Sequence, residues 1–186
     1  MARRYARLWL SIWDDDDFTS LDPATQNAYL ALISSRDLSW CGVAPMLPKR
    51  LARLSKGSTE RKVAASIDQL EAHSFVVTDS DTDEILVRRF VHYDEVIKQP
   101  NVAKAMCSAM DRVHSQRISD AIDAELRREF REEPDLKGWD AIRSSFPEVY
   151  AKASANPSGN PSAKASANPS GNPSAKGSAI PFRKGA

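Results

Sequence analysis

The segment from Met46 to Val77, MLPKRLARLSKGSTERKVAASIDQLEAHSFVV, constrains the fold of this chain more than any other. Pro48 suits the first turn of a helix, and Lys56-Gly57 is a helix stop. Ser58 or Thr59 is suited to cap a second helix, in which apolar residues recur at helical spacing from Val63 to Leu70. The segment therefore predicts two helices joined by a tight turn and followed by a strand.

Positive charge is concentrated on this helix pair, where Glu60 is the single acid between residues 49 and 62. Cations there can hold DNA phosphates, while Arg and Gln side chains on the second helix can reach base edges. A solvated helical hairpin is the alternative, since most charge runs are only that. The predicted DNA-contacting residues are Lys49, Arg50, Arg53, Lys56, Ser58, Thr59, Arg61, Lys62, Ser66 and Gln69.

The flanking segments place the helix pair in a recognisable order. Asp22-Pro23 predicts a capped helix that stops near Arg36-Asp37, and Leu38–Met46 predicts a brief strand. After the pair, 75–78 (FVVT) and 84–91 (EILVRRFV) predict a β-hairpin. Helix, strand, helix, helix and hairpin is the order of a winged helix, one of the layouts that place a helix in a DNA groove. The alternating 5–13 segment (YARLWLSIW) predicts an edge strand or an extended arm.

These features together resemble a known family. The features are the aromatic-rich start, the capped helix with Gln26 and Tyr29-Leu30, the run RLARLS, the 63–70 helix and the hairpin ending in VRRFVHYDEVIKQPN. Together they resemble the N-terminal winged-helix domain of phage replication-initiation proteins. These form the replisome-organiser or DnaD-like group. The resemblance covers roughly the first hundred residues. It implies binding of double-stranded DNA at a replication origin and recruitment of a helicase or helicase loader by later segments.

The hairpin departs from what a DNA-gripping wing requires. Its tip carries Asp79, Asp81, Asp83 and Glu84, which phosphates would repel. We therefore expect the second basic helix and the turn to carry DNA binding. The wing tip is expected to stay off the DNA backbone or to face a protein partner.

Beyond Gln99-Pro100 the pattern is helical. Apolar stripes at 102–113 and 118–130 change phase near 114–117, so one long helix and two shorter ones are both consistent with the sequence. This extension is expected either to pack on the winged helix or to form a homodimer. Leu136, Trp139, Ile142 and Phe146 mark a further short helix ended by Pro147.

The tail repeats itself. Residues 151–162, AKASANPSGNPS, recur letter for letter at 163–174, and a degenerate copy follows. With cations, no acid and almost nothing to bury, this segment predicts a disordered linker. The terminal peptide with Ile180, Phe182 and Arg183 predicts a partner-binding tip, the alternative being an ordinary chain end. The expected divisions are 1–100, winged helix; 101–148, helical extension; and 149–186, disordered linker with terminal peptide.

The predicted fold class is thus mainly α with a small β-hairpin (α+β). We expect a winged helix-turn-helix followed by C-terminal helices and a disordered tail. Two distant cysteines and three scattered histidines predict no metal site, no disulfide and no cofactor. The best candidate for a catalytic set is His92-Tyr93-Asp94-Glu95, which contains a possible nucleophile and acids. In a strand, however, His92 and Asp94 would point away from Tyr93. We therefore expect no enzyme and no catalytic residues. No membrane insertion is expected, and the cytoplasm is the expected compartment, that of the host if a phage encodes the chain.

Three functions are consistent with the sequence. As a replication initiator, the chain would bind origin DNA and use its C-terminal segments for recruitment. As a transcriptional regulator or excisionase-like factor, it would use the same helices, with the extension serving dimerisation. A winged helix used only for protein contacts is the third reading, which the acidic hairpin tip permits. The long tethered tip favours the first.

Overall fold

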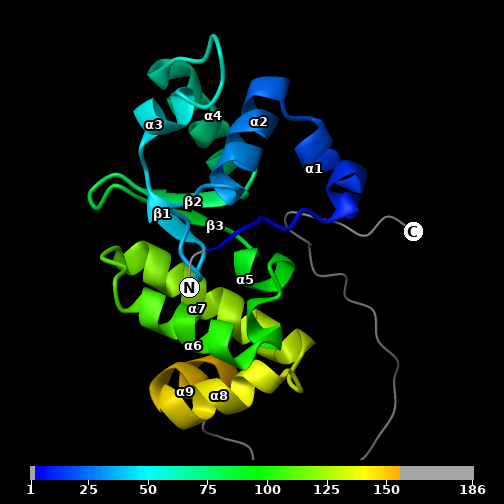
Figure 1. Cartoon of the computed structure of the whole chain (residues 1–186), viewed down its shortest axis with the longest axis vertical. Helices are drawn as coiled ribbons and strands as arrows, with labels where there is room; N and C mark the ends of the chain where they lie inside the picture. The colour runs from blue at the N-terminus through cyan, green and yellow to red at the C-terminus, as the bar shows by residue number, and fades with distance from the viewer. Residues whose placement is uncertain (1–2, 156–186) are drawn as a thin grey trace, which may run out of the picture.

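The structure is a computed structural model that describes residues 3–155. It is mainly helical with one small antiparallel sheet, which confirms the predicted fold class (Figure 1). The elements are η1 (Leu10–Asp14), α1 (Asp16–Thr19), α2 (Pro23–Ile33), β1 (Val43–Pro45), α3 (Pro48–Ala52), α4 (Glu60–Ala72), β2 (Val76–Asp79), β3 (Glu84–Val87), α5 (Phe90–Tyr93), η2 (Val96–Lys98), α6 (Pro100–Met110), α7 (Gln116–Glu132), α8 (Lys137–Ser145) and α9 (Pro147–Ser154).

The segment from α2 to β3 has the topology of a winged helix. Its three strands lie in the order β1-β3-β2, and both pairs are antiparallel, with Val43 opposite Leu86 and Val76 opposite Val87. Helix α4 packs on both α2 and α3. Beneath them, Phe18, Tyr29 and Phe75 meet edge to face with ring centroids 5.6–5.8 Å apart. These contacts fix α2 and α4 relative to the sheet.

Side-chain caps set several helix starts. Asp22 accepts hydrogen bonds from the backbone N–H groups of Ala24 and Thr25, and Pro23 occupies the first position of α2, as expected. Thr59 accepts from the N–H of Lys62 and caps α4, so of the two predicted caps it is the one used. Ser115 does the same for α7 through the N–H of Ile118.

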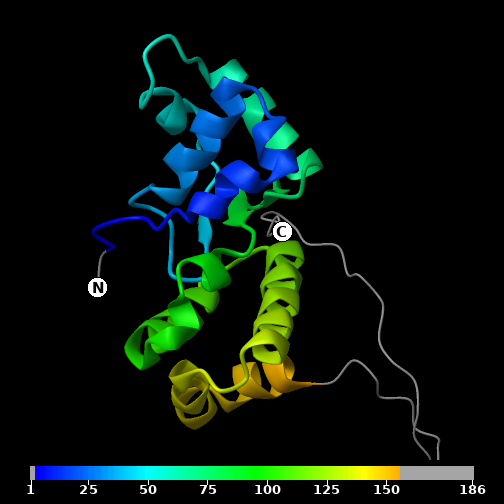
Figure 2. The ribbon, with the colours of Figure 1, turned by 90° about the vertical axis from the view of Figure 1, so that its right-hand side faces the viewer.

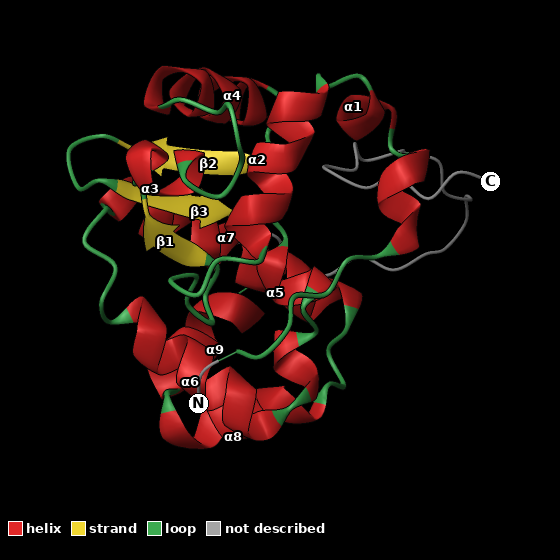
Figure 3. Ribbon diagram, turned by 45° about the horizontal axis from the view of Figure 1, so that its top comes forward, coloured by secondary structure: helices red, strands yellow, loops and turns green. Residues whose placement is uncertain are grey.

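The C-terminal helices pack on the winged-helix unit. Figure 3 shows the yellow sheet between α2–α4 on one side and the C-terminal helices on the other, and α7 contacts β2, β3 and α5. Met106, Ile118 and Leu126 are buried in the same apolar cluster as Ile85 and Leu86. The two apolar stripes of the extension therefore belong to two separate helices, α6 and α7, and the extension packs on the winged helix. Dimerisation stays a prediction. Figure 2 shows α7 rising from α8 and α9 toward the winged-helix unit.

Sequence expectations about element bounds differ from the structure at three places. Residues 5–13 do not form a strand: they run without regular secondary structure into η1, which fits the alternative of an extended arm, and Trp9 Nε1 anchors them by donating to the Tyr93 carbonyl at 2.9 Å. The hairpin's second strand ends at Val87, because Arg89 takes a left-handed conformation (φ 57°) and starts α5. Helix α2 ends at Ile33, before Arg36-Asp37.

The C-terminal boundary also differs from expectation. Helix α8 ends at Ser145, two residues before Pro147, as predicted. Pro147 then occupies the first position of α9, which continues to Ser154, past the expected start of the linker at 149. The remaining linker and the terminal peptide lie outside the described residues. Within residues 3–155, no helix combines the length and the hydrophobicity needed to cross a membrane.

Candidate nucleic-acid interface

Six cations line α3, the following turn and the first turn of α4. We call Lys49, Arg50, Arg53, Lys56, Arg61 and Lys62 the basic surface; all six are exposed. Among the described residues, Arg50 is the one member with an acidic partner, since its guanidinium lies 2.8 Å from Asp37. The surface lies at the opposite end of the molecule from α8 and α9 (Figure 1). Five cations therefore face solvent without a neutralising carboxylate within residues 3–155.

Local structure holds the turn between α3 and α4. Gly57 has φ +82°, a left-handed conformation in which a side chain would be strained, and a Cβ there would meet no neighbour. The Ser55 hydroxyl donates to Asn27 Oδ1 on α2 at 2.7 Å, and Lys62 Nζ donates to the Gly57 carbonyl at 3.3 Å. The turn is thus tied to α2 and to α4, which fixes where its cations project.

The predicted polar residues of α4 have different environments. Thr59 is exposed but occupied as the N-cap, and Ser58 is half-buried. Gln69 is exposed, and its Oε1 lies 2.9 Å from the Thr25 hydroxyl, which also reaches Asp22 Oδ2 at 2.7 Å. Thr25 itself is fully buried, so it holds Gln69 against α2.

The outward placement of Ser66 is wrong. Ser66 is only 5% exposed, because it follows Val63 by three residues and precedes Leu70 by four, which puts it on the buried face of α4. It lines the floor of a hollow of about 370 Å³ between α2 and the α3–α4 turn. Asn27 lines the same hollow and was missed by the sequence reasoning, although its spacing from Ala24 and Ala31 places all three along one side of α2.

The acidic hairpin is bound by the start of α7. The Glu84 carboxylate accepts from the N–H groups of His114 and Ser115, at 3.1 and 2.7 Å, and Asp79 accepts from the Ser115 hydroxyl. Arg117 donates to the Thr78 carbonyl at 2.8 Å and to Glu71 at 2.9 Å. We call these bonds the hairpin–α7 contact. Two of the four wing acids therefore have partners within the chain, while Asp81 and Asp83 are exposed.

The hairpin–α7 contact changes the acidity of its members. The Ser115 hydroxyl bond lowers the pKa of Asp79 below its usual value of 3.8. Burial alone would raise the pKa of Glu71, but hydrogen bonds from Thr78 and the charge of Arg117 together lower it below 4.5. Both carboxylates are thus held in their charged form by the contact.

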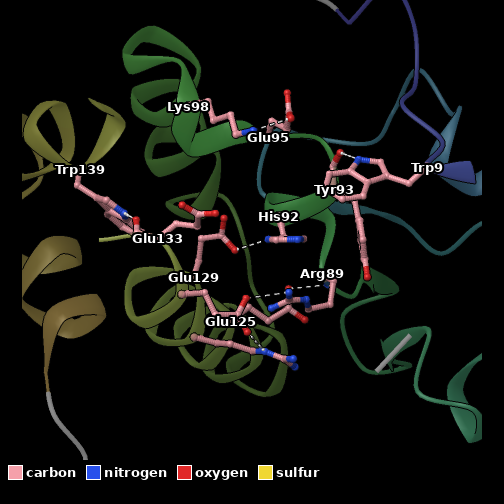
Figure 4. A network of polar contacts seen from close by, with 12 residues as sticks. Trp9, Arg89, His92, Tyr93, Glu95, Lys98, Glu125, Glu129, Glu133 and Trp139 are labelled. Carbon is pink, nitrogen blue, oxygen red and sulfur yellow. Dashed lines mark hydrogen bonds and ion pairs between the residues drawn. The ribbon is translucent and has the colours of Figure 1, made fainter. Parts of the chain in front are cut away.

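A second polar network joins α5 to α7 (Figure 4). Glu125 Oε2 accepts the backbone N–H of Arg89 at 2.8 Å, the Arg89 side chain lies 3.0 Å from Glu132, and His92 Nδ1 lies 3.0 Å from Glu129. Burial raises the pKa of Glu125, although Arg89 and Arg88 oppose that effect. The network fastens the C-terminal helices to the winged-helix unit just beyond its last strand.

His92, Glu129 and Glu132 bring ligand atoms within 4.8 Å of one another, a grouping that sequence spacing did not reveal. The two oxygens of Glu132 already accept from Arg89 and Arg128, at 3.0 and 2.8 Å, and His92 is paired with Glu129. These side chains therefore satisfy one another, and we assign them to the network. The expected strand alternation between His92 and Tyr93 is wrong, since both residues lie on helix α5.

The predicted partner-binding residues Ile180, Phe182 and Arg183 lie outside the described residues. Comparisons of the chain with protein-family models, with curated proteins and with solved structures each found no match. What the basic surface binds is therefore inferred from its own chemistry.

Proposed function

We propose that this chain binds double-stranded DNA through the basic surface. The observation that carries the proposal is the set of five exposed cations without acidic partners, Lys49, Arg53, Lys56, Arg61 and Lys62, on the helix pair of a winged-helix topology. Clustered cations of this kind are attracted to phosphates, and a helix–turn–helix can place its second helix in the major groove.

The residues divide by role. Lys49, Arg53 and Lys56, on α3 and the turn, hold phosphates and set the orientation of the protein on the duplex. Arg61 and Gln69 lie on the exposed face of α4, where Arg can read guanine and the Gln amide can reach adenine. Because Thr25 holds Gln69 against α2, that amide is already oriented before DNA arrives. Sequence preference then comes from α4 and affinity from the cations around it.

The hairpin takes no part in gripping the DNA backbone. Its Asp79 and Glu84 are occupied by Ser115 and the start of α7, and its exposed Asp81 and Asp83 would repel phosphates. DNA binding therefore depends on helices α3 and α4 rather than on the wing.

Within DNA-binding proteins, we place the chain with replication initiators. The resemblance of its first hundred residues to phage replication-initiation proteins supports this role, as does the tethered tip with Ile180 and Phe182, which would recruit a helicase or its loader. A regulator would need the helix pair but has less use for the tip.

The direct experiment is selection of DNA by the purified chain. Double-stranded fragments that tile the source genome are mixed with the protein and an excess of non-specific competitor, at about 50 mM and about 200 mM salt. We expect one fragment to be retained selectively, and less strongly at the higher salt concentration. A fragment that contains an origin supports initiation, and one that contains a divergent promoter supports regulation instead. Absence of any salt-sensitive retention would overturn the DNA-binding proposal.

A further inference from the structure

An exposed apolar pair projects from the short helix η1. Leu10 is 84% exposed and Trp13 is 53% exposed. In a 3₁₀-helix, side chains three residues apart eclipse one another, so Leu10 and Trp13 stand on the same side of η1. Asp14, Asp16 and Asp17 are exposed beside them, and none forms an ion pair within residues 3–155. We call these five residues the acidic knob.

A groove of complementary character lies between α2 and α3. Its apolar residues include Leu47, Leu51 and Leu54, of which Leu54 is 64% exposed, and its volume is about 380 Å³. Arg36 and Arg50 stand on its rim, where Asp37 is the single acid. We call this the leucine groove. Asp37 already pairs with Arg50 at 2.8 Å, so Arg36 is the rim cation without an acidic partner among the described residues. Exposed leucines beside such a cation favour an occupant with apolar side chains and carboxylates.

The knob and the groove cannot meet within one molecule. Figures 1 and 3 both show α1 and α3 on opposite sides of α2, and the knob lies in and beside α1. We propose that the acidic knob of one copy binds in the leucine groove of a second copy. Leu10 and Trp13 contact Leu47, Leu51 and Leu54 of that copy, and the aspartates lie toward Arg36 and Arg50.

Because the knob and the groove lie on opposite sides of α2 (Figures 1 and 3), two copies cannot make the contact twice, so it does not close as a two-fold dimer does. Each bound pair keeps one free knob and one free groove, and further copies add head to tail. With few apolar residues on each side, the contact is weak in solution. It becomes effective where copies are concentrated, as on neighbouring DNA sites. Self-association itself does not depend on the proposed DNA binding, so either proposal can fail alone.

The test measures the mass of the full chain by sedimentation across a concentration series without DNA. The wild-type mass is expected to rise with concentration beyond that of a dimer. Leu10→Ser with Trp13→Ala removes the knob, and Leu54→Ser removes the groove; each variant is expected to stay monomeric to concentrations about tenfold higher. An equimolar mixture of the two variants retains one intact knob and one intact groove, and is expected to form dimers and nothing larger.

Tyr5→Ala is the matched control, because Tyr5 is an equally exposed apolar residue (69%) outside the knob, and it should associate as the wild type does. Circular dichroism checks that each variant is folded. A wild type that stays monomeric, a mixture that forms no dimer, or a knob variant that still associates would each overturn the proposal. Affinity for a short duplex with one site should be unchanged in the knob variant, which separates this proposal from DNA binding.

Discussion

Glu125 is the side chain on which the junction between the winged-helix unit and α7 most depends. It is buried, and one oxygen accepts the N–H of Arg89, a residue whose positive φ of 57° ends the sheet and begins α5. Its other oxygen lies 3.5 Å from the Arg88 side chain. A single carboxylate on α7 thus satisfies the backbone where the chain turns from β3 into α5.

Replacing Glu125 tests this role. Glu125→Ala leaves the buried Arg89 N–H without its acceptor and should lower the free energy of unfolding by about 3 kcal/mol. Glu125→Gln keeps an acceptor oxygen for the Arg89 N–H and loses the charge, which burial already disfavours, together with the long contact to Arg88, so it should cost about 1 kcal/mol or less. Urea unfolding of the two variants measures both values. Equal losses would show that the hydrogen bond to Arg89 contributes little.

Residue-level prediction from the sequence succeeded for exposed charges and failed for small polar groups. The cations from Lys49 to Lys62 lie on the surface because a lysine or arginine is rarely buried without a partner. A serine can be buried without a charged partner. Ser66 was predicted to face outward because its side chain is polar, although its spacing places it on the apolar face of α4. The left-handed conformation of Arg89 was also not predictable, since it depends on the distant Glu125.

Among the elements, the hairpin–α7 contact gives a structural role to two of the four wing acids. Asp79 and Glu84 accept hydrogen bonds at the N-terminus of α7, where the helix dipole also favours negative charge. Ser115 is the central residue, because it both caps α7 and donates to Asp79.

Ser115→Ala removes the cap of α7, which should lower the free energy of unfolding by about 1–2 kcal/mol at about pH 7, and it also removes the hydrogen bond to Asp79. The loss should shrink at about pH 3. The pKa of Asp79 is lowered in the folded chain, so its contribution is complete above the unfolded value of 3.8 and disappears as the pH falls through the folded value. Unfolding curves at the two pH values measure the change.

Ser108→Ala is the matched control, since Ser108 is an exposed serine within α6 whose hydroxyl bonds only the Lys104 carbonyl. It should be close to neutral at both pH values. A Ser115→Ala cost that is the same at both pH values would contradict the assigned role of Asp79.

Elements whose start or end is set by neighbouring residues in the sequence were predicted correctly. Elements that depend on contacts with distant parts of the chain were not. The caps Asp22 and Thr59 and the helices they begin follow from adjacent residues alone. The alternation of 5–13 is typical of a strand, but a strand needs a partner, and this segment is held by side chains instead. Gly138 gave no sequence signal, yet a Cβ there would lie 2.1 Å from the Ile97 carbonyl, so α8 can dock only with glycine at this position.

The basic surface and the polar contacts of α7 lie in different parts of the molecule. The basic surface is at the end formed by α3 and α4, while the hairpin–α7 contact and the α5–α7 network join the winged-helix unit to the C-terminal helices (Figure 1). The order of helices and strands, and hence the candidate site, could be predicted from periodicity. The packing of the extension could not, because an apolar stripe does not specify which surface covers it.

The salt dependence of DNA binding by Arg61→Ala with Lys62→Ala tests the central claim most directly. Each phosphate contact contributes about 0.9 to the slope of log affinity against log salt. With Lys62 as a phosphate contact and Arg61 as a base contact, the double variant should bind more weakly and lose about 0.9 from that slope. Lys104→Ala with Arg112→Ala is the charge-matched control, because both residues are exposed cations of α6 and the turn that follows it. The control should keep the wild-type affinity and slope. An unchanged affinity and slope in the Arg61 and Lys62 variant would contradict the assignment of α4 to DNA.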